Sequence, residues 1–176
     1  MSQVSDVILY FSNDITLLNN YYSESEEVRH RFADELRRGF LEKTDENRTV
    51  LSIKLKDCAD FGDLLRTVYQ NMVKEENSPP EDLPLSIWQR TIRTLDRRME
   101  REGKHICLLI EEFHLCRVWD DTDFSWFREF LYHSDVFSCI TVSESHLERF
   151  AHRPPFGSPL SNIFTVVERI SEELYE

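Results

Sequence analysis

Two adjacent carboxylates, Glu111 and Glu112, directly follow the apolar run 106–110. The length and composition of this run predict a buried strand. In an α/β protein, ligands bind at the carboxyl ends of the strands. Two acids at such a place have the chemistry to hold a metal ion and to activate a water molecule. An active site of this kind would hydrolyse a nucleotide, with Glu111 holding the metal and Glu112 orienting the water.

A second set of chemically capable residues, Glu112, His114 and Cys116, alternates along the same segment. Mixed nitrogen, sulfur and oxygen ligands do bind metal ions in proteins. However, a strand that ends at Glu111 does not keep three alternating side chains on one face, and no second ligand pair with matching spacing follows. We therefore expect no metal site from these three residues.

The composition describes an acidic chain of 176 residues that is rich in aromatic side chains. Its 21 basic and 33 acidic residues give a net charge of −12, which disfavours nucleic acid as a partner but leaves room for a local basic patch. The four cysteines show no paired spacing, so we expect them to be reduced and the protein to be cytoplasmic. No run approaches the ~18 apolar residues of a membrane span, and the first residues do not form a signal peptide.

Strand-like apolar runs alternate with amphipathic segments along the whole chain. This order predicts one domain over 1–176, a three-layer αβα fold with a five-stranded, mainly parallel sheet. The expected strands are 7–11, 49–55, 106–111, 137–142 and 163–167. The expected helices are one that opens with the capping box 23–26 and others over 60–75, 85–102, 120–132 and 145–150. The proline-containing segments 77–84 and 153–159 are expected to be loops.

Two segments resemble motifs of a known family. Leu108-Leu-Ile-Glu-Glu-Phe113 resembles the Walker B segment, and Ser158-Pro-Leu-Ser-Asn-Ile-Phe164 is similar to the turn into the last strand of bacterial and archaeal STAND-type ATPases. Over nearly its whole length the chain resembles the AAA+ and STAND branch of P-loop ATPases. The resemblance implies the strand order 5-1-4-3-2 and a P-loop NTPase type of fold. It also implies that Ser143 or Ser145 lies near the position that senses the γ-phosphate.

The chain departs from this family pattern at three places. Members carry a Gly-x-x-x-x-Gly-Lys-Ser/Thr loop after the first strand, whose backbone N–H groups hold the phosphates. Here the segment 12–18 follows the first expected strand and contains neither glycine nor lysine, and Asp14 falls where the lysine is expected. Glu111 replaces the usual metal-holding aspartate, and the helical lid is not expected because the chain stops at Glu176. In an active protein, Asn13, Asp14, Thr16 and Ser143 would remain as the nucleotide contacts.

The helix expected over 85–102 has two distinct faces. Trp88, Ile92, Leu95 and Met99 fall within about 60° of one another and form a core face. The opposite side carries a basic stripe, whose members fall within about 80°: Arg90, Arg93, Arg97, Arg101 and Lys104. This stripe is either a solvated face paired with nearby acids or a docking face for an acidic partner or for nucleic-acid phosphates. The net charge favours the protein partner.

The aromatic segment 124–132 has more apolar area than one helix face can bury. Trp126 points away from the expected core, so it is either covered by the loop after Glu112 or exposed as an interface anchor.

These features together predict a catalytically inactive STAND/AAA+-like domain that serves as a regulatory or scaffolding subunit. We expect it to act through protein–protein contacts at the basic stripe and Trp126, in a homomeric or heteromeric assembly, without a cofactor and without enzymatic activity. Two alternatives stay open. One is a subunit that binds and hydrolyses ATP with magnesium after a partner chain completes the site. The other is a nucleic-acid-associated module that uses the basic stripe.

Overall fold

Five parallel strands form one sheet in the order β2-β3-β4-β1-β5, the order that the family resemblance implied. The computed structural model describes residues 2–73, 84–151, 160 and 162–175. Because β3 lies between β2 and β4, its last residue, Glu111, lies in the interior of the carboxyl edge rather than at a side of the sheet. The strands are β1 Leu18–Tyr22, β2 Arg48–Lys54, β3 His105–Glu111, β4 Phe137–Ser143 and β5 Val166–Arg169.

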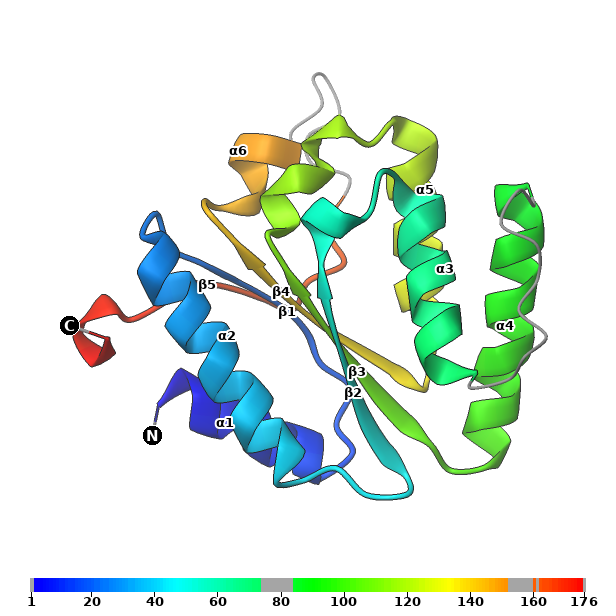
Figure 1. Ribbon diagram of the computed structural model, residues 1–176, viewed down its shortest axis with the longest axis horizontal. Helices are drawn as coiled ribbons and strands as arrows, with labels where there is room; N and C mark the ends of the chain where they lie inside the picture. Colours follow the sequence, from blue (N-terminus) through cyan, green and yellow to red (C-terminus); the bar gives the residue numbers. More distant parts are fainter. Residues whose placement is uncertain (1, 74–83, 152–159, 161, 176) are drawn as a thin grey trace.

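Helices cover both faces of the sheet, which gives the predicted three-layer architecture (Figure 1). One face packs against α1 Gln3–Ser12 and α2 Glu26–Leu41. The other packs against α3 Phe61–Met72, α4 Leu85–Arg101 and α5 Asp121–Tyr132. The short helix α6 Leu147–Ala151 follows β4, and three short 3₁₀ segments complete the described chain: η1 Leu55–Asp57, η2 Phe113–Val118 and η3 Glu172–Leu174.

Side-chain caps determine where three of these helices begin. The side chain of Ser25 accepts a hydrogen bond from the backbone N–H of Val28 and so caps α2. Asp60 caps α3 and Asp120 caps α5 in the same way, which satisfies backbone donors that have no partner within the helix. The helices expected in these regions are confirmed, but the capping box expected over 23–26 is not, because Ser25 and not Ser23 caps α2.

The prediction of a first strand over 7–11 is wrong, because these residues belong to α1. Val7 and Phe11 are buried, whereas Leu9 and Tyr10 are 49% and 46% exposed. An apolar run that is buried only at every third or fourth position has the period of a helix, and its length of five residues was too short to reveal that period.

The first strand is instead β1, a segment whose composition disfavours a strand. Asn19 and Asn20 are buried in it, and asparagine is depleted in strands. Asn20 compensates for its burial by donating hydrogen bonds from Nδ2 to Thr141 Oγ1 (2.8 Å) and Ser143 Oγ (3.2 Å) on the neighbouring strand β4. Tertiary hydrogen bonds therefore stabilise a strand that local propensity does not favour.

The remaining strand predictions agree with the structure to within a few residues, except at the last strand. β5 covers 166–169 instead of 163–167, and Ile163 and Phe164 are buried ahead of it. Apart from Pro84, the expected loops 77–84 and 153–159 lie outside the described residues.

The alternation of side chains along β3 decides which layer Glu111 faces. Ile106, Leu108 and Ile110 belong to the apolar cluster beneath α3, α4 and α5. Cys107 and Leu109 belong to the cluster beneath α1 and α2. Glu111 continues the second series and therefore faces the α1–α2 layer.

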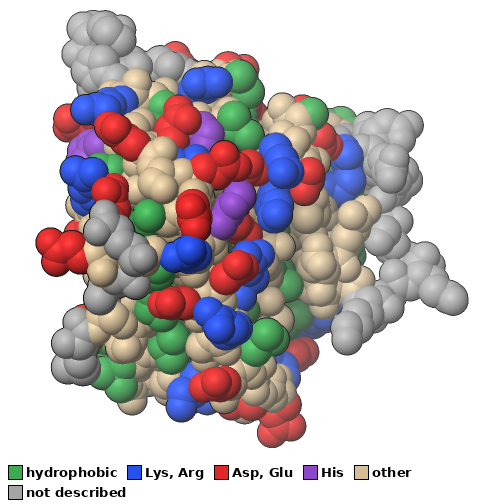
Figure 2. All heavy atoms as spheres, turned by 60° about the vertical axis from the view of Figure 1, so that its left-hand side comes forward, with side chains coloured by type: hydrophobic (Ala, Val, Ile, Leu, Met, Phe, Trp, Pro, Cys, Tyr) green, Lys and Arg blue, Asp and Glu red, His purple; other side chains and the backbone are tan. Residues whose placement is uncertain are grey.

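Charged side chains dominate the surface on the α1–α2 side. In the view of Figure 2, acidic and basic side chains are interspersed over this face and the apolar areas between them are small. No helix among the described residues is long and apolar enough to span a membrane.

Candidate functional site

The carboxyl ends of three neighbouring strands bring the expected site residues together. Tyr22 at the end of β1 pairs with Ser143 at the end of β4, and Ile110 of β3 pairs with Thr141. The sequence-predicted residues Glu111, Glu112 and Ser143 therefore lie at one edge of the sheet, where α/β proteins bind ligands.

Glu111 is buried (3% exposed) and is already neutralised by a side chain of the same chain. Arg37 of α2 donates a hydrogen bond from Nη1 to Glu111 Oε1 at 2.9 Å, and Ser52 Oγ lies 3.4 Å from the same oxygen. A guanidinium therefore lies against the carboxylate where the family resemblance expected a magnesium ion. A metal ion could bind Glu111 only if it displaced this cation or bound beside it.

Glu112 has a different environment from Glu111. Its backbone takes a left-handed conformation (φ 56°), which is uncommon for a residue with a side chain and turns the chain from β3 into η2. The carboxylate lies 3.8 Å from Lys56 Nζ, next to η1. The two adjacent acids thus contact different cations, so they do not converge on one metal position in this arrangement.

A very short turn joins β1 to α2, at the place where P-loop proteins bind phosphate. Only Ser23, Glu24 and Ser25 lie between the last residue of β1 and the first residue of α2. The phosphate-loop motif spans about eight positions and needs glycine for its backbone turns. The side chain of Arg29 folds back over the turn and donates to the carbonyls of Ser23 (2.6 Å) and Glu24 (3.0 Å). No room for a phosphate cradle is left in this turn.

The charge at the start of α2 also opposes a bound phosphate. A helix amino terminus attracts anions through its free N–H groups and its dipole. Here Ser25 occupies one of these N–H groups, and Glu26 and Glu27 place two carboxylates in the first turn. These carboxylates are stabilised by the helix dipole and would repel a nucleotide triphosphate.

Ser143, the expected phosphate sensor, lies in a closed polar network. Its side chain is fully buried and donates from Oγ to the carbonyl of Ser145 at 2.9 Å. The same hydroxyl accepts from Asn20, and the backbone of Ser23 donates to the Ser143 carbonyl. Ser143 therefore joins β1, β4 and the short turn, and its hydrogen bonds are used within the protein.

His114 fixes η2 against the end of β4. The backbone N–H of Glu144 donates to its Nδ1 (3.3 Å), and its Nε2 lies 3.6 Å from the Glu144 carboxylate. Burial lowers the pKa of His114, while the Glu144 carboxylate opposes this shift. The residues that are described contain no cluster of three or more potential metal ligands, and Glu112, His114 and Cys116 do not form one.

Three of the expected nucleotide contacts lie at the opposite edge of the sheet. Asn13, Asp14 and Thr16 lie between α1 and β1, so they precede the first strand instead of following it. The physical reason is the misassigned strand: a segment before a strand lies at its amino end, far from the carboxyl edge. The alignment of Asp14 with the phosphate-binding lysine is therefore wrong.

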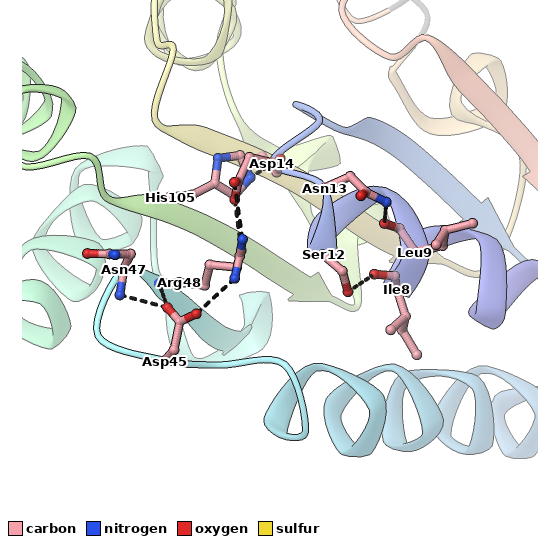
Figure 3. Close-up of polar contacts among 10 residues, drawn as sticks. Ile8, Leu9, Ser12, Asn13, Asp14, Asp45, Asn47, Arg48 and His105 are labelled. Carbon is pink, nitrogen blue, oxygen red and sulfur yellow. Dashed lines mark hydrogen bonds and ion pairs between the residues drawn. The ribbon is translucent and has the colours of Figure 1, made fainter.

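Asp14 has a structural environment at this amino edge (Figure 3). Arg48 Nε donates to its Oδ1 at 2.8 Å and Arg48 Nη2 to its Oδ2 at 3.1 Å, while Nη1 of the same arginine donates to Asp45. The hydrogen bond from Arg48 holds the pKa of Asp14 below its usual range. Asn13 uses its side-chain amide to cap the carbonyl of Leu9 at the end of α1. Asp14 and Asn13 thus support the connection from α1 to the sheet.

The segment 23–25 lies where P-loop proteins have their phosphate loop, between the first strand and the next helix. The serines that precede the acidic first turn of α2 indicated a helix start in the sequence, and this helix start was the signal that could have identified the segment. It lacks glycine and lysine, as does the segment 12–18 that was expected there. The conclusion that the chain has no phosphate-loop motif is therefore unchanged by the correction.

The four arginines of the basic stripe are exposed on α4, whereas Lys104 follows the helix and is partly buried, and the members differ in their contacts. Arg93 Nη2 forms an ion pair with Glu129 Oε2 of α5 at 2.7 Å. Lys104 donates to the carbonyl of Glu46 in the connection between α2 and β2. Among the described residues, no ion pair involves Arg90, Arg97 or Arg101.

Trp126 is half-buried. It lines a small hollow between α3, α4 and α5 with Leu65, Ile92 and Phe130. Leu65 of α3 and Ile92 of α4 lie beside Trp126 in this hollow.

Comparisons with known proteins place the fold. Neither a protein-family model nor a curated protein sequence matches the chain. Solved structures do match. The ORC1 protein of Aeropyrum pernix in complex with DNA has a TM-score of 0.71 at 8% identity, over 95% of this chain and 44% of that chain. Cdc6p of Pyrobaculum aerophilum has a TM-score of 0.68 at 10% identity, over 96% and 43%. Drosophila ORC bound to DNA has a TM-score of 0.68 at 12% identity, over 95% and 40%.

These similarities define the class of the fold. The chain has the fold of an AAA+ P-loop ATPase-like domain, with the strand order and the layers of that class. It spans less than half the length of each of these three structures.

Proposed function

We propose that this domain neither binds nor hydrolyses nucleotide and acts through protein–protein contacts, as a regulatory or scaffolding subunit. The observation that carries the proposal is the turn 23–25, which replaces a phosphate cradle with three residues and is followed by two acids at the start of α2. The ion pair between Arg37 and Glu111 supports it, because the metal-holding position has an internal cation. The fold alone does not imply the activity, because function depends on the site.

The test is calorimetric titration with Mg·ATP and with Mg·ADP. We expect no heat of binding at millimolar nucleotide, for the wild type and for Glu111→Gln alike. Glu46→Gln is the matched control, since it makes the same chemical change at an exposed position before β2. Micromolar binding that Glu111→Gln alters and Glu46→Gln does not would overturn the proposal and establish the two glutamates as a nucleotide site.

Nucleic-acid binding is the second candidate, favoured by the exposed arginines of α4. Two of the compared structures contain DNA. The net charge of −12 opposes it, because the field of the whole molecule repels a polyanion. An affinity for duplex DNA that falls steeply with salt and is reduced by Arg93→Gln/Arg97→Gln would favour this candidate.

A further inference from the structure

A groove with an unusual lining runs between α3 and α4. Its volume is about 380 Å³, and it is open to solvent along one side. Arginine, threonine and apolar side chains line it together: Tyr69, Val73, Arg90, Thr91, Thr94, Leu95, Arg98 and Arg101. We call it the α3–α4 groove.

Helix geometry divides the arginines of α4 between two sides. At about 100° per residue, Arg90 and Arg97 point directly away from the core face, whereas Arg101 is rotated from them by about 20–40° and Arg98 by about 80–100° toward α3. Arg93 is rotated by about 40–60° in the opposite sense, and it lines a separate hollow beside α5 together with Arg97. The basic stripe expected from the sequence is thus split, and Arg98, which the sequence analysis left out, belongs to the groove.

The two sides differ in how far their charge is neutralised. On the α5 side, Glu129 forms a close ion pair with Arg93, and Asp96 lines the same hollow as Arg97. On the groove side, the ion pair found among the described residues is a distant one between Arg98 Nε and Glu102 Oε1, at 3.8 Å between half-exposed side chains. Exposed pairs at such distances contribute about 0–1 kcal/mol. Among the residues that the structure describes, no close ion pair neutralises the three arginines of the groove.

The floor of the groove is apolar and well supported. Tyr69 packs edge-on against the buried ring of Trp88, with ring centroids 5.6 Å apart, and Arg66 lies over the same indole at 5.8 Å. Val73 and Leu95 are buried on either side of the groove. A ligand would therefore meet a fixed apolar surface between cationic rims.

We propose that the α3–α4 groove is the docking site for an acidic segment of a protein partner. Its carboxylates would pair with Arg90, Arg98 and Arg101, and an apolar side chain between them would contact Tyr69. The inference rests on the proposed function, because it names the surface and the chemistry through which that function operates. The span from Arg90 to Arg101 is about 16 Å at 1.5 Å per residue, which matches three turns of a bound helix.

Charge complementarity selects a protein over a nucleic acid as the occupant. The groove is a local basic area on a chain of net charge −12, so a compact acidic segment meets less overall repulsion than a long polyanion. A phosphate backbone also has no apolar group to place on the floor formed by Tyr69, Val73 and Leu95. Protein segments with alternating carboxylates and leucines satisfy both parts of the lining.

Fluorescence anisotropy with a labelled peptide tests the proposal. The probe is a helical peptide in which leucine recurs at every third or fourth position and glutamate fills the remaining positions. We expect saturable binding that Arg98→Gln/Arg101→Gln weakens by at least about tenfold. The matched control Arg93→Gln/Arg97→Gln removes the same charge from the α5 side of the same helix, and we expect it to weaken binding by less than about twofold.

Further measurements distinguish specific docking in the groove from attraction by net charge alone and from DNA binding. Serine in place of the probe's leucines should abolish binding if the apolar floor takes part. If both double variants weaken peptide binding equally, only the net charge of the helix determines binding, and the proposal that the groove is the docking site is overturned. Duplex DNA that competes for the groove more tightly than the peptide would also overturn the proposal. Circular dichroism and thermal unfolding of each variant verify that these exposed substitutions leave the fold intact.

The outcomes distinguish this inference from the proposed function. If substitution of Arg98 and Arg101 has no specific effect on peptide binding and no nucleotide binds, the docking site is excluded and the proposed function stands. If nucleotide binds and the substitution of Arg98 and Arg101 still weakens peptide binding, the proposed function is excluded and the docking site stands.

Discussion

Arg37 and Glu111 form the most consequential side-chain pair of the carboxyl edge. The side chain of Glu111 is 4% exposed and that of Arg37 is 31% exposed, so water reaches the pair from the Arg37 side only. A second acid, Asp34, also accepts from Arg37, which holds the guanidinium at the surface of α2. The segment that resembles the family motif therefore ends in a carboxylate that already has an arginine of another element as its partner.

The stability of the protein should depend on this pair. Arg37→Ala leaves Glu111 buried without a cation, and we expect a loss of about 2 kcal/mol in the free energy of unfolding. This is below the ~3–5 kcal/mol of a fully buried pair because Arg37 is partly solvated. Urea unfolding measures the loss. Arg38→Ala, at an exposed position one residue further along α2, should cost less than about 0.5 kcal/mol. Equal losses in the two variants would show that the pair does not stabilise the fold.

At the scale of elements, the close contact between α1 and α2 depends on one glycine. A Cβ atom on Gly39 would lie 1.9 Å from Ile8 Cδ1 and 2.9 Å from Ile8 Cγ1. The missing side chain of Gly39 therefore leaves the space that the Ile8 side chain fills between α1 and α2.

The effect of Gly39→Ala on the free energy of unfolding should therefore have opposite signs with and without the Ile8 side chain. Alanine normally stabilises a helix interior by about 1 kcal/mol relative to glycine. We expect Gly39→Ala to destabilise the wild type by about 1–2 kcal/mol, because Ile8 must move. In an Ile8→Ala background the same change should stabilise, since the clashing atoms are absent. Thermal unfolding of the four proteins of this cycle provides the test, and additive effects would contradict the close contact.

The elements also show how far the sequence predicts this fold. The buried strands β3 and β4 and the capped helices α2, α3 and α5 carry strong local signals, so their prediction was confirmed. α1 was predicted as a strand because an apolar run of five residues is ambiguous. β1 was not predicted, because Asn19 and Asn20 obtain their hydrogen bonds from within the sheet. The candidate site followed the same rule. The sequence predicted the place of Glu111, Glu112 and Ser143 because they lie at the ends of recognisable strands. It could not predict the contact of Arg37 with Glu111 or the role of the turn 23–25, because both depend on how distant elements pack together.

At the scale of the whole molecule, two buried histidines link stability to pH. His105 starts β3, and its Nε2 lies 3.1 Å from the buried Ser138 Oγ. Burial lowers the pKa of His105, while the nearby Asp14 opposes this shift and Arg48 adds to it. The pKa of His114 is lowered as well, also by burial. In the unfolded chain both regain an ordinary pKa near 6.5.

The sign of the pH dependence follows from these shifts. Below pH ~6.5 the unfolded chain binds protons that the folded protein does not, so stability is full above this pH and falls as the pH drops. We expect a slope of less than about 1.4 kcal/mol per pH unit for each histidine. His105→Gln should flatten the curve of unfolding free energy between pH 7 and 5.5, and His114 should account for the remaining slope. An unchanged curve in this variant would exclude His105 as a source of the dependence.

The three-residue turn between β1 and α2 has a consequence for any attempt to give this domain an ATPase activity. Substitutions change side chains, but they cannot lengthen a connection, and a phosphate loop needs about eight positions where this chain has three. Building a phosphate loop at this place would require inserted residues, a different position for the Arg29 side chain and replacement of the acids at the start of α2. Single-residue changes, whether made in the laboratory or by drift, lead to other versions of the same short turn.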